Sequence, residues 1–185
     1  MSNKGSMEQE FLQRFEDWYS AEMPRLFNYV CYRLSDRSAA EELTANICLL
    51  ALSRADQFKP DKGTLSNWIF GIARNTIRNH FRAERRQARQ VSLDALPEII
   101  AEHASPDQAL ELRERFMQIV EGLHQLPEIE QEIVALRYGG DLSNAEIAQI
   151  MDLKKGHVAV MLHRSIKKLQ KYCLQNEMGA HVQER

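Results

Sequence analysis

The fold is decided by the stretch LSNAEIAQIMDLKKGHVAVML, residues 142–162. Ser143 and Glu146 have the spacing of a capping box, which predicts the start of a short helix that continues through Ile147 and Met151. A tight turn at residues 152–153 follows, and the apolar spacing from Val158 onward predicts a second helix over about 155–172. Two helices joined by a tight turn, the second of them basic, are typical of a helix-turn-helix whose second helix enters a DNA major groove.

Helical periodicity also governs the chain upstream of this stretch. Apolar residues recur at spacings of three and four without a sustained alternation of two, so we predict an all-α fold. We expect further helices over about residues 11–18, 24–34, 38–51, 65–90, 116–123 and 127–138. Pro24 fits the first turn of its helix, and Ser38 with Glu41 has a second capping-box spacing. The glycines at 139–140 end the last of these helices.

The charges are strongly polarised along the chain although the formal net charge is only −2. Six arginines and one acidic residue lie between Ile72 and Gln90, and six basic residues and no acidic residue lie in the stretch Lys154–Lys171. The stretch Val91–Leu112 instead carries five acids and no Lys or Arg. We therefore predict two small helical domains that each contact a polyanion. Their expected bounds are 8–90 and 109–175, with an acidic linker at 91–108 and a tail at 176–185.

The helix expected over about 65–90 has an apolar face and a cationic face. The apolar face carries Trp68, Ile69, Ile72, Ala73, Ile77 and Phe81, and the cationic face carries Arg74, Arg78, Arg82, Arg85 and Arg89. The alternative for such a run is a solvated helix face, but only Glu84 is available to pair with six arginines. Side chains able to contact bases are interleaved with them, namely Asn67, Asn75, Asn79 and His80. Phe58 and Trp68, at the junction of loop and helix, are candidates to stack on unpaired bases.

The composition excludes several classes of protein. With 185 residues, 44% of them hydrophobic and 27% charged, the chain is typical of globular proteins. Its longest apolar run, Ile47–Leu52, is too short to span a bilayer, and the first residues lack the apolar stretch of a secretory signal, so we expect a cytoplasmic protein without membrane insertion. Neither a P-loop nor GxGxxG nor HExxH is present, and no histidines have ligand spacing, so we expect no enzyme, cofactor or metal.

Several blocks of the chain resemble the extracytoplasmic-function (ECF) group of bacterial RNA polymerase sigma factors. Residues 26–30 (LFNYV), 40–44 (AEELT) and 68–75 (WIFGIARN) are similar to successive blocks of sigma region two. Residues 126–128 (LPE), 133–138 (IVALRY) and 142–148 (LSNAEIA) are similar to region four. The resemblance covers about residues 10–175, with the blocks in the order and spacing of the family.

The resemblance implies a sigma factor that binds core RNA polymerase, recognises promoter DNA in duplex and single-stranded form, and melts the minus-ten element. It implies a minus-ten site made of Phe58, Lys62, Asn67, Trp68, Arg74, Asn75, Arg78, Asn79 and Arg82. The implied minus-thirty-five site is Lys154, Lys155, His157, Val158, Met161, His163 and Arg164. The implied polymerase contacts are Glu41, Glu42, Leu43, Asn46 and Leu49. An anti-sigma protein is the remaining expected partner.

Two other functions remain open at the level of sequence. One is a sigma-like mimic that binds an anti-sigma protein without touching promoters. The other is a stand-alone helix-turn-helix repressor, which leaves the N-terminal helices unexplained. Binding to core polymerase separates the three hypotheses, because only the sigma factor requires it.

Overall fold

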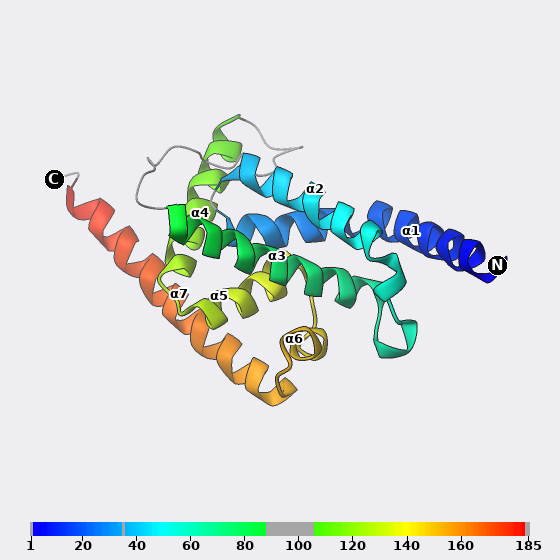
Figure 1. Ribbon diagram of the computed structural model, residues 1–185. Coiled ribbons are helices and arrows are strands. Elements are labelled where there is room, and N and C mark those ends of the chain that lie inside the picture. Colours follow the sequence, from blue (N-terminus) through cyan, green and yellow to red (C-terminus); the bar gives the residue numbers. More distant parts are fainter. Residues whose placement is uncertain (1, 35, 88–105, 184–185) are drawn as a thin grey trace.

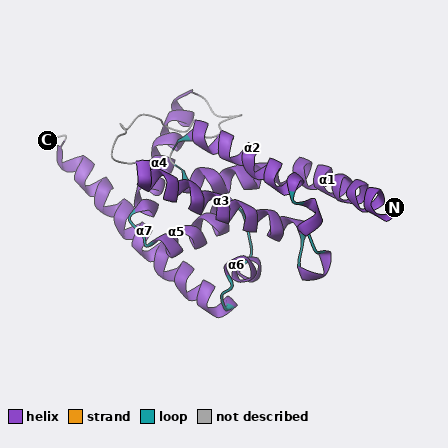
Figure 2. Cartoon of the chain, in the orientation of Figure 1, coloured by secondary structure: helices purple, strands orange, loops and turns teal. Residues whose placement is uncertain are grey.

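A computed structural model of the chain describes residues 2–34, 36–87 and 106–183. Its elements are α1 (Ser2–Arg33), α2 (Arg37–Ser53), two 3-10 turns (Ala55–Gln57 and Pro60–Lys62), α3 (Leu65–Gln87), α4 (Pro106–His124), α5 (Glu128–Val134), a π-helical turn (Ala135–Gly139), α6 (Asn144–Met151) and α7 (Lys155–Gln183). Figure 2 shows helices and loops and no strand in this part of the chain, which confirms the all-α prediction. None of the described helices combines the length and the apolar character needed to cross a membrane.

The helix α1 corrects the prediction that a new helix begins at Pro24. The helix is continuous from Ser2 to Arg33, with Pro24 in its interior. An interior proline removes one backbone hydrogen bond and costs about 3 kcal/mol. The apolar residues on both sides of it, from Phe15 to Tyr29, are buried in one core, and this shared burial offsets the cost.

The start of α2 differs from its prediction as well. Asp36, and not Ser38, caps the helix, because its carboxylate accepts hydrogen bonds from the backbone N–H groups of Ser38 and Ala39 at 2.8 and 3.2 Å. Ser38 therefore lies in the first turn, and Glu41 pairs with Arg37 at 2.8 Å.

The capping box at Ser143 and Glu146 is confirmed, with both of its reciprocal hydrogen bonds present. Asp152 ends α6 in the left-handed conformation, and the N–H of Leu153 bonds back to the carbonyl of Ala148 at 2.8 Å. The helix α7 then begins at Lys155, as expected, and continues beyond the predicted end to Gln183. The predicted helix-turn-helix is therefore present as α6, a tight turn and α7.

The helices on either side of the predicted linker pack against each other. Figure 1 shows α1, α2 and α3 together, with α4 and α5 beside them, α6 below α3 and α7 along the outside. The helix α1 packs on α2, α3 and the π-helical turn, while α3 packs on α6. Residues of both halves belong to one buried cluster that includes Leu26, Phe70, Leu136 and Ile147. Most of the predicted linker, residues 91–105, lies outside the described residues, and its last three residues already belong to α4.

A buried charged network joins α1 to α5. Arg33 on α1 has 2% of its surface exposed, and its guanidinium lies 3.8 Å from the carboxylate of Glu132 and donates to the amide oxygen of Gln131 at 2.9 Å. The Tyr29 hydroxyl donates to the same Glu132 carboxylate. Burial and the neighbouring Glu132 charge raise the pKa of Tyr29 well above its ordinary value, so Tyr29 stays a hydrogen-bond donor at neutral pH.

Candidate nucleic-acid interface

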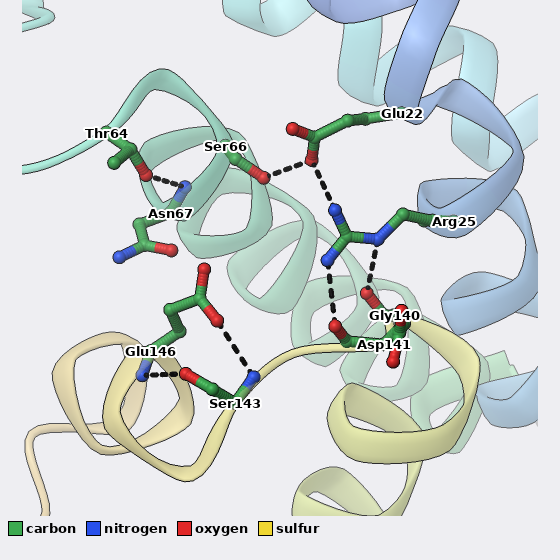
Figure 3. Close-up of polar contacts among 9 residues, drawn as sticks. All are labelled: Glu22, Arg25, Thr64, Ser66, Asn67, Gly140, Asp141, Ser143 and Glu146. Atoms are coloured by element: carbon green, nitrogen blue, oxygen red, sulfur yellow. Dashed lines mark hydrogen bonds and ion pairs between the residues drawn. The ribbon is translucent and has the colours of Figure 1, made fainter.

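A polar cluster holds α1, the start of α3 and the segment before α6 together (Figure 3). Glu22 on α1 accepts a hydrogen bond from the Ser66 hydroxyl at 2.6 Å and pairs with Arg25 at 3.0 Å. Arg25 in turn donates to the backbone carbonyls of Gly140 and Asp141 at 3.0 and 2.9 Å. These bonds span 115 and 116 residues of sequence, so they fix the two halves of the chain to each other.

Beside this cluster lies a basic cavity of about 540 Å³. Its walls come from the loop between α2 and α3, from one face of α3, and from α6. The residues that line it are Arg54, Gln57, Phe58, Lys59, Lys62, Gly63, Thr64, Asn67, Trp68, Gly71, Ile72, Arg74, Asn75, Gln149 and Ile150. Four of these side chains are cationic and none is acidic, so the cavity favours an anionic ligand.

Asn67 lines the cavity and carries a buried side-chain acceptor that is unsatisfied among the described residues. The residue is 8% exposed, and its backbone N–H is fixed by the Thr64 hydroxyl at 3.1 Å. Its side-chain Nδ2 donates to the Gln149 side chain on α6 at 2.8 Å. Its buried Oδ1 has no hydrogen-bond partner among the residues that the structure describes. A buried polar atom without a partner costs about 1 to 3 kcal/mol, and a ligand that donates a hydrogen bond here would remove that cost.

Aromatic side chains form the apolar wall of the cavity. The Trp68 ring meets the rings of Phe58 and Phe11, with centroids 5.5 and 6.0 Å apart. Phe58 also meets Phe11 edge-on at 6.0 Å. Because this cluster anchors Trp68 and Phe58 from behind while both line the cavity, it provides a rigid surface on which a base can stack.

The cationic face of α3 extends from the cavity along the helix. Arg74 and Asn75 line the cavity, and Arg78, Asn79 and Arg82 follow at helical spacing, half-buried or exposed. On the opposite face Ile69, Phe70, Ala73 and Ile77 are fully buried, as the apolar period predicts. No acidic side chain in the described part of the chain pairs with Arg78 or Arg82, while Glu84 lies 3.3 Å from His80. The predicted roles of the Arg85 and Arg89 side chains fall outside the described residues.

A second cationic surface lies at the start of α7. Lys154, Lys155, His157, His163 and Arg164 are exposed there, as a DNA-reading helix requires. Val158 is fully buried, which corrects the expectation that it reads a base, because its position faces the core shared with α5 and α6. Met161 is half-buried and packs against the same core.

The predicted polymerase contacts lie on α2. Glu41, Glu42, Asn46 and Leu49 are exposed, and Leu49 has 66% of its surface accessible. Leu43 is 8% exposed and belongs to the core, so it supports the helix from inside and is not a surface contact. A groove of about 560 Å³ beside these residues is lined mainly by apolar side chains, including Tyr19, Met23, Phe27, Cys48 and Leu49.

Nine of the fifteen residues that line the cavity are missing from the predicted minus-ten site, among them Arg54, Lys59 and Gln149. Arg54 and Lys59 lie near the predicted loop, and their charge was the signal that could have found them. Gln149 carried no such signal, because it lies 82 residues from Asn67 in sequence and reaches the cavity only through the packing of α6 on α3. No group of three or more metal-ligating side chains gathers within the described ranges.

Family models match both halves of the chain. Residues 18–87 match the model of Sigma-70 region 2, and residues 116–169 match that of Sigma-70, region 4. The chain is 28% identical over 156 residues to the ECF RNA polymerase sigma factor BldN of Streptomyces coelicolor, a match that covers 84% of this chain and 58% of that relative. It is 24% identical over 160 residues to the ECF RNA polymerase sigma factor RpoE of Cereibacter sphaeroides, with 85% of each protein covered.

Two solved structures share the fold. One is the sigma factor RpoE in complex with the anti-sigma factor NepR from Bartonella quintana, with a TM-score of 0.69, 20% identity, and coverage of 86% of this chain and 96% of that one. The other is CnrH in complex with the cytosolic domain of CnrY, with a TM-score of 0.64, 20% identity, and coverage of 90% and 92%.

Proposed function

This chain belongs to the ECF group of the sigma-70 family of RNA polymerase sigma factors, and from that membership we propose that it is an alternative sigma factor that directs core RNA polymerase to promoters. Sigma factors are non-enzymatic subunits of transcription initiation, so the polymerase carries out the chemistry. We assign the chain to the cytoplasm, where the polymerase acts.

The observation that carries the proposal is the basic, aromatic-lined cavity next to the arginine face of α3. We assign it to the unpaired bases of the minus-ten element. Asn67, Trp68 and Asn75 would contact the nucleobase, and Lys62 and Arg74 would lie near the DNA backbone. Stacking of a base on an aromatic side chain contributes about 1 to 3 kcal/mol. Opening one base-pair step costs about 1.4 kcal/mol, so capture of one base offsets the opening of about one step.

The remaining surfaces have matching roles in this proposal. Arg78 and Arg82, which pair with no acidic side chain in the ranges that the structure describes, hold the phosphates beyond the cavity. The exposed basic side chains at the start of α7 contact the duplex minus-thirty-five element. Lys154 and Lys155 oppose the helix dipole there, and a nearby phosphate would stabilise their charges. The exposed side chains of α2 contact core polymerase.

An anti-sigma protein is a further proposed partner. The similar RpoE and CnrH structures are complexes, with NepR and with the cytosolic domain of CnrY, and these complexes support the proposal. The apolar groove beside Leu49 is a candidate contact for either partner of α2.

The test is a pull-down of core polymerase followed by transcription from genomic promoters. A sigma factor binds core polymerase and starts transcripts at defined sites. Binding to an anti-sigma protein without binding to core would establish the mimic instead, and binding to duplex DNA in the absence of core would establish the repressor.

A further inference from the structure

The proposed minus-ten cavity is closed on one side by the other half of the chain. Gln149 and Ile150, on α6 of the helix-turn-helix, line it, and Gln149 makes the polar contacts. Its Oε1 accepts a hydrogen bond from Nδ2 of Asn67 at 2.8 Å, and its Nε2 donates to the backbone carbonyl of Lys62 at 2.9 Å. A side chain Cβ at Gly63 would lie 2.8 Å from the same Nε2, so the loop fits closely around the amide.

The Gln149 amide offers the same chemistry as the edge of a base. Its side-chain amide carries a hydrogen-bond acceptor next to a donor, and a nucleobase presents the same pair along its hydrogen-bonding edges. We propose that Gln149 is an internal plug: in the free chain it occupies the base site of the minus-ten cavity, and an unpaired base takes its place when α6 moves away. This inference rests on the proposed function, because it assigns the cavity to an unpaired promoter base.

The plug satisfies only part of the site. Asn67 Nδ2 is bonded to Gln149, but no atom of the described chain bonds the buried Asn67 Oδ1. A base edge with a donor beside its acceptor can bond both atoms of the Asn67 amide at once. The base exchanges the bond that Gln149 makes to the Lys62 carbonyl for a bond to the buried Asn67 Oδ1. This exchange removes the cost of a buried unpaired acceptor, so the base can displace the plug.

The packing of the two halves keeps the plug in register. Arg25 on α1 donates hydrogen bonds to the backbone carbonyls of Gly140 and Asp141, which lie shortly before α6 (Figure 3). Arg33 and Glu132 form a buried pair between α1 and α5. Because these contacts lie outside the cavity, they position α6 without filling the base site, and separation of the halves withdraws Gln149 together with its helix.

The test compares the affinity of the wild-type chain and of Gln149 variants for single-stranded DNA, each as the free, full-length protein. The probe is a fluorescein-labelled single-stranded oligonucleotide of mixed sequence, followed by fluorescence anisotropy. One net hydrogen bond changes an equilibrium by about fivefold, so loss of both plug bonds in Gln149→Ala should tighten binding by about five- to thirtyfold. Gln149→Met, which keeps the side-chain length but loses the amide, should also bind more tightly.

The matched control is Gln170→Ala, an exposed glutamine on α7 whose side chain makes no hydrogen bond within the described part of the chain. It should bind the probe like the wild type. Hydrogen exchange of residues 58–67 should increase in both Gln149 variants, because the Lys62 carbonyl loses its partner, and stay unchanged in the control. The gain in binding should disappear when Asn67→Ala is added to Gln149→Ala.

The outcomes separate this inference from the proposed function. If wild-type chain initiates transcription with core polymerase but both Gln149 variants bind the probe no more tightly than wild type, the plug is wrong and the sigma-factor proposal stands. If wild-type chain does not initiate with core polymerase, the proposed function itself fails. Weaker binding by the variants would make Gln149 a DNA contact and would likewise overturn the plug.

Discussion

Substituting Gly139 by alanine tests how tightly the two halves of the chain are joined. Gly139 ends the π-helical turn and lies directly against α1. A Cβ at this position would lie 2.8 Å from the Cα of Tyr29 and 3.0 Å from both the Tyr29 nitrogen and the Asn28 carbonyl oxygen. All three are backbone atoms of a helix and cannot rotate away, so α1 and the π-helical turn must move apart.

The expected magnitude follows from two opposing effects. Overpacking of a filled interface costs about 1 to 3 kcal/mol. Alanine favours a helical backbone over glycine by about 1 kcal/mol, and this gain offsets part of the cost. We therefore expect Gly139→Ala to lower the free energy of unfolding by about 1 to 2 kcal/mol, or roughly 2 to 8 °C in melting temperature.

The assay is thermal unfolding followed by circular dichroism, together with small-angle X-ray scattering. Gly71→Ala is the matched control, because it adds the same methyl group to α3 where, apart from the adjoining backbone of α3, no heavy atom of the described chain lies within 4 Å of the new Cβ. The control should be as stable as the wild type or slightly more so. If Gly139→Ala has the same melting temperature as the control and keeps the wild-type radius of gyration, the close packing of the two halves in solution is refuted.

Four further changes test individual parts of the site. Arg82→Ala should weaken promoter binding at most sequences and lower the slope of log affinity against log salt by about one, as the loss of one phosphate contact requires; an unchanged slope would exclude that contact. Asn75→Ala should impair promoter opening and spare core binding, so normal permanganate reactivity of the promoter would contradict its role. Glu132→Gln leaves Arg33 buried without its counter-charge and should cost about 3 to 5 kcal/mol in urea unfolding; a smaller loss would mean that Arg33 is solvated. Burial raises the pKa of the Glu146 carboxyl, but the hydrogen bonds to Ser143 and the charge of Arg25 outweigh it and hold that pKa below its ordinary value. Its contribution to stability should therefore be present above the ordinary glutamate pKa and be lost as the pH falls through the lowered pKa, and this loss should be absent in Glu146→Gln.

Local features of this protein were predictable because they depend on neighbouring residues. The capping box at Ser143 and Glu146 needs only a serine and a glutamate three residues apart, and it is present. The apolar face of α3 follows from the 3.6-residue period, and Ile69 and Ile77 are buried as that period requires. The sequence also identified the family, because its motifs are short blocks read along the chain.

Predictions failed where packing overrode a local signal. Pro24 marked a helix start by its own chemistry, yet burial of α1 on both sides of it maintains one continuous helix. The base-reading role of Val158 came from the family resemblance and fails for another reason, because the apolar period of α7 itself places Val158 on the buried face.

The sequence by itself determined the helices, their buried faces, the two basic surfaces and the family. Only the tertiary structure decided that the halves share one core, that Arg33 meets Glu132, and that Gln149 enters the cavity beside Asn67. The physical reason is that a helical period specifies which face of a helix is buried but not which distant helix covers it. That choice depends on contacts between residues about 80 to 116 positions apart, which no local pattern encodes.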